Sequence, residues 1–397
     1  MVAAPVGLAA SNAPRRRIRS IEGEGRQLRS EAGGRGSLME KTQYVIPFEQ
    51  CDLTMVNRVG GKCASLGELL KARIPVPPGF AVTTDAYDLF LQEKGLHERV
   101  FTRLEGLDES TIEQTEQASR DIREWIEAGT ISEMLEDLIA EEYRLLSRRA
   151  RCPALPVAVR SSATAEDLPG ASFAGQQDTF LWIRGVDDLL DRVKRCWSSL
   201  FTPRAIAYRV KMGFAHSQVR LSVGVQKMVR SFTAGVMFTL NPATGDRATV
   251  VIDSNWGYGE SVVSGEVTPD QFHVNKITNE ITRKTISDKA IYYTTDPETD
   301  EVKKLEVDPE RRKSQSLLDS EILQLTELAR RIEKHYGKQM DIEWATEKSL
   351  PLSGEIYIVQ SRPETVWSQK ETKPIVEPKA SALEHIVAGL IKGRKLK

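Results

Sequence analysis

The chain has 397 residues, of which 40% are hydrophobic and 28% are charged, a composition typical of a globular protein with one large or two medium domains. The formal net charge of -1 excludes a global bias toward polyanions, and no run approaches the roughly 20 apolar residues that span a bilayer, so we expect no nucleic acid and no membrane as partner. The four cysteines are widely spaced without a C-x-x-C pair, which excludes the usual zinc and redox motifs and favours reduced thiols in a cytoplasmic protein.

The first 38 residues differ from the rest, because they are rich in Arg, Gly and Ser and show no apolar periodicity. This composition is typical of disorder, and we assign residues 1–41 to a disordered N-terminal extension. A secretory signal is not indicated, because the weak apolar run from Val2 to Ala10 precedes the arginines. An organellar presequence and a start assigned upstream of Met39 both explain the composition, and we favour the second.

From Tyr44 onward the sequence shows the periodicity of folded elements. Residues 58–91 read as a Gly-rich turn, a helix, a Pro-rich turn, a strand and another helix. Residues 108–150 carry apolar residues at helical spacing on both sides of the sequence AGT, which predicts two amphipathic helices. Residues 186–213 again show a helical pattern.

The second half is richer in strand patterns, and it shows no internal repeat. Strands are predicted over 219–229, 233–240, 248–260, 339–347 and 355–362, and a helix over 319–336. We expect two lobes, 42–218 and 219–368, that meet near Val219, and a linker-like tail over 369–397.

The last two predicted strands place polar side chains on one face. Asp341 and Glu343 point to one side of their strand, because alternate residues share a face. In the next strand Gln360 and Arg362 share a face, and Ile358 precedes them on it. If the strands pair, two carboxylates, an amide oxygen and a guanidinium converge, and oxygen ligands of this kind suit Mg²⁺ beside a substrate phosphate. An isolated D-x-E is more often a solvated strand face, but the apolar opposite face favours a site.

The stretch GGKCASLGELL offers a second cluster. Its two glycines allow a tight turn, and Lys62 would stand beside the N–H groups of a helix start, which together bind anions. The chain contains neither a G-x-x-x-x-G-K-[ST] loop nor a G-x-G-x-x-G after a strand. Taken alone, a Gly-Gly-Lys stretch is more often a plain turn with a solvated lysine.

A third cluster begins with PVAVR, a buried strand that delivers Arg160 at its end. Ser161 and Ser162 supply hydroxyls, and Gly170 and Gly175 bracket a soft segment. A fixed cation beside a flexible lid suits a polyphosphate that must be bound and then covered, whereas the simpler alternative is a surface loop after an edge strand.

Six stretches together carry a family resemblance, in unbroken order from about Tyr44 to Trp367. They are RVGGKCASLGEL, AVRSSATAEDLPGASFAGQQDTFL, SSLFTPRAIAYR, VGVQKMV, WGYGESVVSG and KQMDIEWA with IYIVQSRPETV. The chain resembles the ATP-binding region of the phosphoenolpyruvate synthase (pyruvate, water dikinase) family, which is shared with pyruvate phosphate dikinase. The resemblance implies an α+β fold of the ATP-grasp type, with two lobes that sandwich Mg·ATP, and ATP and Mg²⁺ as cofactors.

The resemblance also implies roles for individual residues. The phosphate-binding and catalytic positions fall on Lys62, Arg160 and Arg362. The metal-binding positions fall on Glu343 and Gln360, with Asp341 in support.

Further positions of the family bind the nucleotide. They are Gly175 and Thr179 in the Gly-rich lid over Ala171–Thr179, Gln226 and Met228 in the segment that meets adenine, and Glu260 in the W-G-x-G-E motif. Tyr258 departs from the pattern, which has a smaller aliphatic residue there.

Family members continue into a swivelling domain whose histidine accepts phosphate, and this sequence lacks that motif. Its histidines are His97, His216, His273, His335 and His385, and none has the family's Gly-Gly-x-[ST]-x-His context. We therefore expect an ATP-binding subunit or fragment that passes phosphate to a phosphohistidine-domain protein on a separate polypeptide. Two alternatives stay open: a phenylphosphate synthase-like or other phosphotransferase subunit with a different acceptor, and a non-catalytic nucleotide-binding protein.

Overall fold

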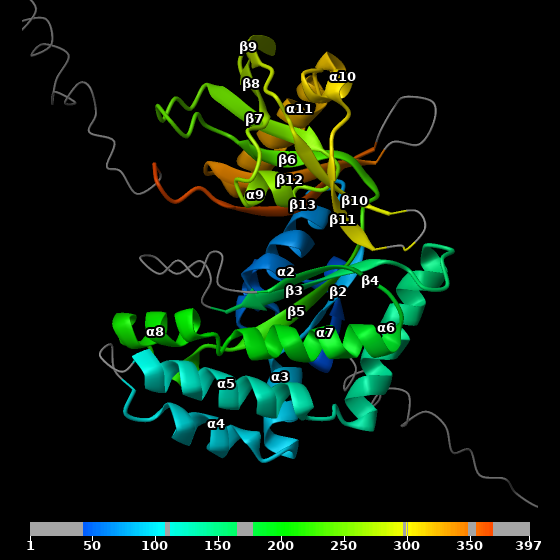
Figure 1. Cartoon of the computed structure of the whole chain (residues 1–397). Coiled ribbons are helices and arrows are strands. Elements are labelled where there is room, and N and C mark those ends of the chain that lie inside the picture. The colour runs from blue at the N-terminus through cyan, green and yellow to red at the C-terminus, as the bar shows by residue number, and fades with distance from the viewer. Residues whose placement is uncertain are drawn as a thin grey trace, which may run out of the picture. The chain divides into compact units, whose positions relative to one another are not determined.

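The computed structural model describes residues 43–107, 112–164, 178–296, 299, 301–347 and 355–367. The predicted N-terminal extension, most of the Gly-rich lid and the tail over 369–397 lie outside the described residues. Within them the chain combines helices with antiparallel sheets, so the predicted α+β class is confirmed (Figure 1). No helix of this described part is long and apolar enough to cross a membrane.

The first sheet has five antiparallel strands in the order β1-β2-β5-β3-β4. These strands are β1 Val45–Pro47, β2 Gly79–Val82, β3 Val157–Ala163, β4 Thr179–Ile183 and β5 Leu221–Lys227. β5 follows the expected lobe boundary at Val219, yet it pairs with β2 and β3. The chain passes to the second sheet only between Lys227 and Ser231.

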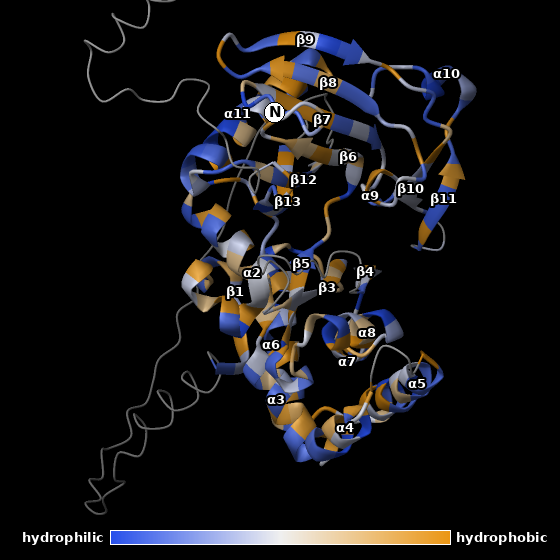
Figure 2. Cartoon of the chain, turned by 90° about the vertical axis from the view of Figure 1, so that its left-hand side faces the viewer, coloured by the Kyte–Doolittle hydropathy of each residue, from blue (hydrophilic) through white to orange (hydrophobic). Residues whose placement is uncertain are grey.

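The second sheet has six antiparallel strands in the order β13-β12-β6-β7-β8-β9. They are β6 Ser231–Phe238, β7 Thr249–Trp256, β8 Asp270–Asn275, β9 Glu280–Thr285, β12 Met340–Glu347 and β13 Glu355–Pro363. The outer strand β9 is largely hydrophilic (Figure 2), as suits an edge strand whose side chains meet solvent. A separate two-stranded ribbon joins β10 Ile291–Thr295 to β11 Val302–Glu306.

The helices fall into two groups along the chain. In the first half they are α2 Val56–Lys71, α3 Thr84–Glu93, α4 Leu96–Leu104, α5 Ile112–Ala128, α6 Glu133–Arg149, α7 Val186–Ser199 and α8 Pro203–Met212, with short 3₁₀ turns η1 Phe48–Gln50, η2 Leu53–Met55 and η3 His216–Gln218. In the second half they are α9 Glu260–Val263, α10 Pro309–Arg312 and α11 Asp319–Tyr336. The two helices predicted over 108–150 and the helix over 319–336 are confirmed.

The helical stretch predicted over 186–213 is confirmed, and it consists of two helices. The α7 helix ends at Ser199, and Thr202 caps α8 by accepting a hydrogen bond from the Ala205 N–H at 3.3 Å. Pro203 then occupies the first helical position, where its missing N–H costs nothing.

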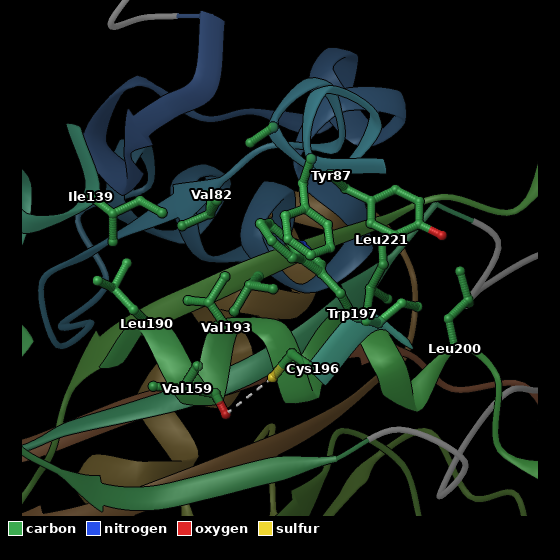
Figure 3. Close-up of a cluster of buried hydrophobic side chains, with 14 of the residues drawn as sticks. Val82, Tyr87, Ile139, Val159, Leu190, Val193, Cys196, Trp197, Leu200 and Leu221 are labelled. Atoms are coloured by element: carbon green, nitrogen blue, oxygen red, sulfur yellow. Dashed lines mark hydrogen bonds between the residues drawn. The ribbon is translucent and has the colours of Figure 1, made fainter. Parts of the chain in front are cut away.

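One face of the first sheet packs against α3 to α7. Val159 of β3, Val193 and Trp197 of α7 and Tyr87 of α3 belong to this core (Figure 3). The Cys196 thiol donates to the Val159 carbonyl at 3.8 Å, so α7 lies directly on β3.

The α2 helix belongs to a different core, which joins the two sheets. Its buried residue Leu66 clusters with Ala81 of the first sheet and with Ile342 and Trp344 of the second. The helix α11 covers the same face of the second sheet, through Ile322 among others.

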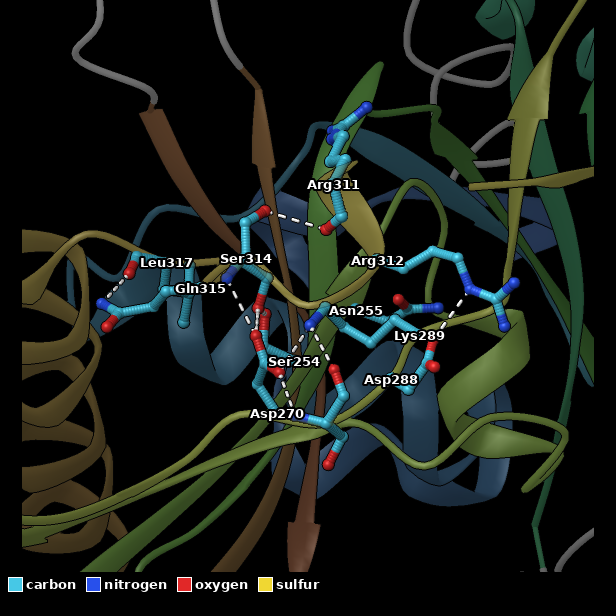
Figure 4. A network of polar contacts seen from close by, with 12 residues as sticks. Ser254, Asn255, Asp270, Asp288, Lys289, Arg311, Arg312, Ser314, Gln315 and Leu317 are labelled. Atoms are coloured by element: carbon cyan, nitrogen blue, oxygen red, sulfur yellow. Dashed lines mark hydrogen bonds and ion pairs between the residues drawn. The ribbon is translucent and has the colours of Figure 1, made fainter. Parts of the chain in front are cut away.

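A buried polar network holds the second sheet to the segment before α11 (Figure 4). Lys289 and Asp270 are both fully buried, and the Lys289 Nζ lies 2.6 Å from the Asp270 Oδ1. The backbone N–H groups of Ser287 and Ser316 donate to the same carboxylate at 2.9 and 2.8 Å. Every charge in this network therefore has a partner, as a buried charge requires.

Candidate functional site

The polar face of the second sheet is set by the register of its strands. Asp341 stands opposite Arg362, and Glu343 stands opposite Gln360. Their neighbours Ile342 and Trp344 are buried in the core on the other face. The predicted pairing of these two strands is therefore observed, and it brings the four polar side chains to one face.

One expectation for this face is wrong. Ile358 was expected to share a face with Gln360, but Ile358 pairs with Trp344 and is buried in the core. The cause is a β-bulge, because the register shifts between Glu343 and Trp344 and leaves Val359 as the extra residue of β13. The bulge turns Gln360 toward Glu343 while Ile358 stays in the core.

The first sheet contributes Arg160, on the face of β3 that Val159 does not occupy. Gly224 of the neighbouring strand pairs with Arg160, and Gln226 pairs with Ala158. The side chains of Arg160 and Gln226 turn toward α2, away from the core that contains Val159.

Lys62 is placed by a kink in α2. The backbone at Gly60 is not helical, with φ of 71° and ψ of 169°, so a regular helix runs only from the next residue. The predicted Gly-rich turn therefore lies inside α2. Lys62 follows it and donates from Nζ to the Ser161 carbonyl at 3.0 Å. The N–H of Cys63 donates to the Ser162 hydroxyl at 3.2 Å, which ties the helix start to β3.

The two sheets meet at Arg160. One of its terminal nitrogens, Nη2, lies 3.1 Å from the Glu343 Oε2 and donates to the Gln360 Oε1. The other, Nη1, donates to the Val359 carbonyl at 3.0 Å. A narrow hollow beside this junction is lined by Lys62, Arg160, Gln226, Val359 and Gln360 among others.

Arg362 and Asp341 form a second ion pair on the same face. The Arg362 Nη2 lies 2.8 Å from the Asp341 Oδ2, and Nε donates to the same oxygen at 2.9 Å. Burial raises the pKa of the Asp341 carboxyl above its ordinary value, and the guanidinium of Arg362 opposes that shift. Asp341 is thus a desolvated carboxylate that a nearby cation stabilises.

Asp253 lies in the same row of the sheet, and the sequence interpretation missed it. Val236 separates it from Glu343, since Val236 pairs with both. Burial raises the pKa of its carboxyl, and Gln271 donates to the Oδ1 at 3.0 Å. The available signal was the alternation of TVVIDSNW, which places Asp253 on the face opposite Ile252.

Other predicted residues lie outside this junction. Thr179 is exposed beside Arg160 on β4, and Glu260 begins α9, where its charge acts on Tyr293. Gln226 lines the hollow.

The Met228 N–H donates to the Pro156 carbonyl at 2.9 Å, so an adenine contact in this segment would use other backbone groups. Gly175 lies outside the described residues.

The donor set at the junction fits a hard divalent cation. Glu343 and Asp341 offer carboxylate oxygens and Gln360 an amide oxygen, the ligands that Mg²⁺ takes together with phosphate and water. The Nε of Arg160 is buried and has no hydrogen-bond partner within the described part of the chain, so this guanidinium keeps one donor for a further acceptor. No group of three or more His, Cys, Asp or Glu side chains that could hold a metal occurs among the described residues, so substrate oxygens would have to complete the coordination.

Comparison with known proteins identifies the family. A model of the pyruvate phosphate dikinase AMP/ATP-binding domain matches residues 56–383. The chain belongs to this family. The resemblance found in the sequence is therefore confirmed, and the described residues are those of an ATP-binding domain.

Curated relatives share this region. The chain is 43% identical over 362 residues to a protein of Staphylothermus marinus named "Probable phosphoenolpyruvate synthase", covering 86% of this chain and 43% of the relative. It is 45% identical over 354 residues to a protein of Methanothermobacter thermautotrophicus with the same name, covering 89% of this chain and 51% of the relative. It is 45% identical over 341 residues to a phosphoenolpyruvate synthase of Pseudomonas aeruginosa, covering 82% of this chain and 42% of the relative. The chain thus spans about half or less of the length of these relatives.

Proposed function

We propose that this chain binds Mg·ATP between the two sheets, which act as the two lobes of an ATP-grasp fold, and that it passes phosphate to a histidine of a separate swivelling domain. The observation that carries the proposal is the junction at Arg160. There a guanidinium of the first sheet meets a carboxylate and an amide of the second, 183 and 200 residues further along the chain. Cations and metal-binding oxygens that face one another across two sheets are what a polyphosphate requires.

The basic side chains and the oxygen-bearing side chains of the site would have different roles. Lys62, Arg160 and Arg362 would bind the phosphate oxygens and neutralise the charge that builds up as the phosphate bridge breaks. Glu343 and Gln360, supported by Asp341, would hold Mg²⁺, which supplies further charge neutralisation when bound. Phosphoryl transfer needs little covalent chemistry from the protein, so positioning by these side chains accounts for most of the catalysis.

The transfer follows the dikinase scheme. An imidazole nitrogen of the acceptor histidine attacks the β-phosphorus, so an N–P bond forms. The bond from that phosphorus to the bridging oxygen of the α-phosphate breaks, and AMP leaves with the electron pair. The histidine then carries the β- and γ-phosphates as a diphosphoryl group. Attack of water on the γ-phosphorus breaks the bond to the β,γ-bridging oxygen, releases inorganic phosphate and leaves the β-phosphate on the histidine. Support comes from the family, whose description names AMP as well as ATP, and from relatives named phosphoenolpyruvate synthase.

The proposed binding of Mg·ATP is tested by calorimetric titration of the full chain with ATP in the presence of Mg²⁺ and, separately, in the presence of EDTA. Replacing Glu343 by Gln removes a carboxylate from the junction, and we expect the Mg²⁺-dependent part of the ATP affinity to fall at least about tenfold. Glu347→Gln is the matched control, because Glu347 lies at the far end of the same strand opposite Glu355. Equal affinities for wild type and Glu343→Gln would contradict the assignment.

A test of the proposed phosphate transfer requires the acceptor domain. The chain, purified with its natural associates, is given ATP labelled at the β-phosphorus, and acid-labile label is located by polypeptide. Label on a histidine-bearing polypeptide supports the transfer. Tight ATP binding without label on any polypeptide would contradict the proposed transfer, but not the proposal that the chain binds Mg·ATP.

A further inference from the structure

Arg160 engages the oxygens that the proposed function assigns to the metal. Its Nη2 contacts the Glu343 carboxylate at 3.1 Å and the Gln360 amide oxygen, and its Nη1 contacts the Val359 carbonyl at 3.0 Å. All these acceptors belong to the second sheet, whereas Arg160 belongs to the first. A guanidinium and a divalent cation compete for these oxygens, because both carry positive charge and repel each other at close range.

The contact is well shielded from solvent. The side chain of Arg160 is 15% exposed and that of Glu343 is 26% exposed. Solvent screens a pair of this kind less than a surface pair, so the positive charge of Arg160 opposes a second cation there more strongly than it would in water. Metal binding at Glu343 and Gln360 therefore requires that the guanidinium first find another partner.

The hollow offers the place for that partner. The Nε of Arg160 is buried and has no hydrogen-bond partner within the described ranges, and Lys62 lines the same hollow. The hollow itself has room for about one water molecule, so a phosphate can bind there only if the hollow widens as the guanidinium turns. Such a phosphate would accept from Arg160 through two parallel N–H groups, the pairing that a guanidinium favours. It would also supply the oxygens that the metal still needs.

We propose that Arg160 is an internal counter-cation, which holds the metal-binding oxygens of Glu343 and Gln360 until the phosphates of ATP draw it away. Divalent metal then binds together with the nucleotide and only weakly without it. This inference rests on the proposed function and adds an order of binding to it. Arg362 does not act in this way, because it pairs with Asp341 inside one strand hairpin and is 42% exposed.

The test is a calorimetric titration of the nucleotide-free full chain with MnCl₂, repeated with a saturating methylene analogue of ATP. The phosphates of the analogue bind Mn²⁺ themselves, so wild type binds Mn²⁺ more tightly with the analogue whatever Arg160 does, and the decisive comparison is between wild type and Arg160→Gln without nucleotide. Arg160→Gln removes the competing charge and keeps a side chain that can donate a hydrogen bond. This variant should bind Mn²⁺ without nucleotide at least about tenfold more tightly than wild type does.

Arg220→Gln is the matched control, because Arg220 also forms an ion pair, with Asp88 at 2.9 Å, at a site away from the junction. Its Mn²⁺ affinity should equal that of wild type. Circular dichroism and thermal unfolding establish that each variant is folded.

Two results would overturn the inference. One is a gain in Mn²⁺ affinity on adding the analogue that is as large for Arg160→Gln as for wild type. The other is a folded Arg160→Gln variant that binds Mn²⁺ no more tightly than wild type. If wild type binds no Mn²⁺ even with the analogue, the proposed function itself fails and the inference fails with it.

Discussion

Gly60 lets the start of α2 approach β3 more closely than any other residue would. A Cβ at this position would lie 2.1 Å from the Ser162 carbonyl oxygen, and the φ of 71° is unfavourable for any residue with a side chain. The close approach matters for the site, because Lys62 follows Gly60 on α2 and Arg160 lies on β3. A single glycine thus sets the spacing of two predicted phosphate-binding side chains.

We predict that Gly60→Ala lowers the free energy of unfolding by about 3 kcal/mol or more, through backbone strain and the clash together. Gly265→Ala is the control, because Gly265 has a similar φ of 73° but no atom within 4 Å of an added Cβ. That variant should lose only the strain, about 1–2 kcal/mol. Urea unfolding of both variants measures the difference. Equal losses would contradict the close approach at Gly60.

At the scale of elements, the end of α8 is joined to η3 by one hydrogen bond between side chains. The fully buried Arg209 donates from Nε to the Nδ1 of His216 at 2.9 Å, and from Nη1 to the Leu200 carbonyl at 2.7 Å. The first bond requires a neutral imidazole, because a protonated Nδ1 could not accept. Burial, and then the charge of Arg209, lower the pKa of His216 to about 4.

This shift predicts a pH dependence of stability. The unfolded chain, with a histidine pKa near 6.5, binds more protons than the folded chain between about pH 6.5 and pH 4. The stabilisation is therefore complete above pH 6.5 and is lost as the pH falls toward 4. His216→Asn supplies an acceptor that does not titrate, so its free energy of unfolding should fall less than that of wild type between pH 7 and pH 5. Parallel slopes in urea titrations of the two proteins would contradict this account.

The sequence predicted most of the helices and strands, but not every pairing between the strands. The strands that carry Asp341 and Gln360, and the polar face they share, follow from alternation along each strand. The bulge at Val359 could not be predicted, because one extra residue in an apolar and polar run leaves a pattern that reads equally well without it. The membership of β5 in the first sheet could not be predicted either, because it depends on pairing with strands far away in the chain. The break between α7 and α8 was readable, since Thr202 and Pro203 form a helix start.

At the scale of the whole described unit, α2 is the element that the two sheets share. Leu66 and Leu69 of α2 belong to the same core as Ala81 of the first sheet and Trp344 of the second. The helix also lies close to neighbouring chain, since a Cβ at Gly67 would be 2.3 Å from the Cys51 carbonyl oxygen. The junction at Arg160 is therefore held by a packed helix as well as by its own polar contacts. Loss of apolar contact on α2 should loosen both sheets.

We predict that Leu66→Ala lowers the amide hydrogen-exchange protection of β5 and of β12, one strand from each sheet. Truncation of a buried leucine costs about 2–5 kcal/mol, and here the lost contacts face a core that both sheets share. Leu135→Ala is the matched control, because Leu135 is equally well buried but belongs only to the core of the first sheet. That variant should reduce protection in β5 much more than in β12. Unchanged protection of β12 in Leu66→Ala would show that α2 stabilises the first sheet alone, and the two sheets would then keep their alignment at Arg160 by polar contacts only.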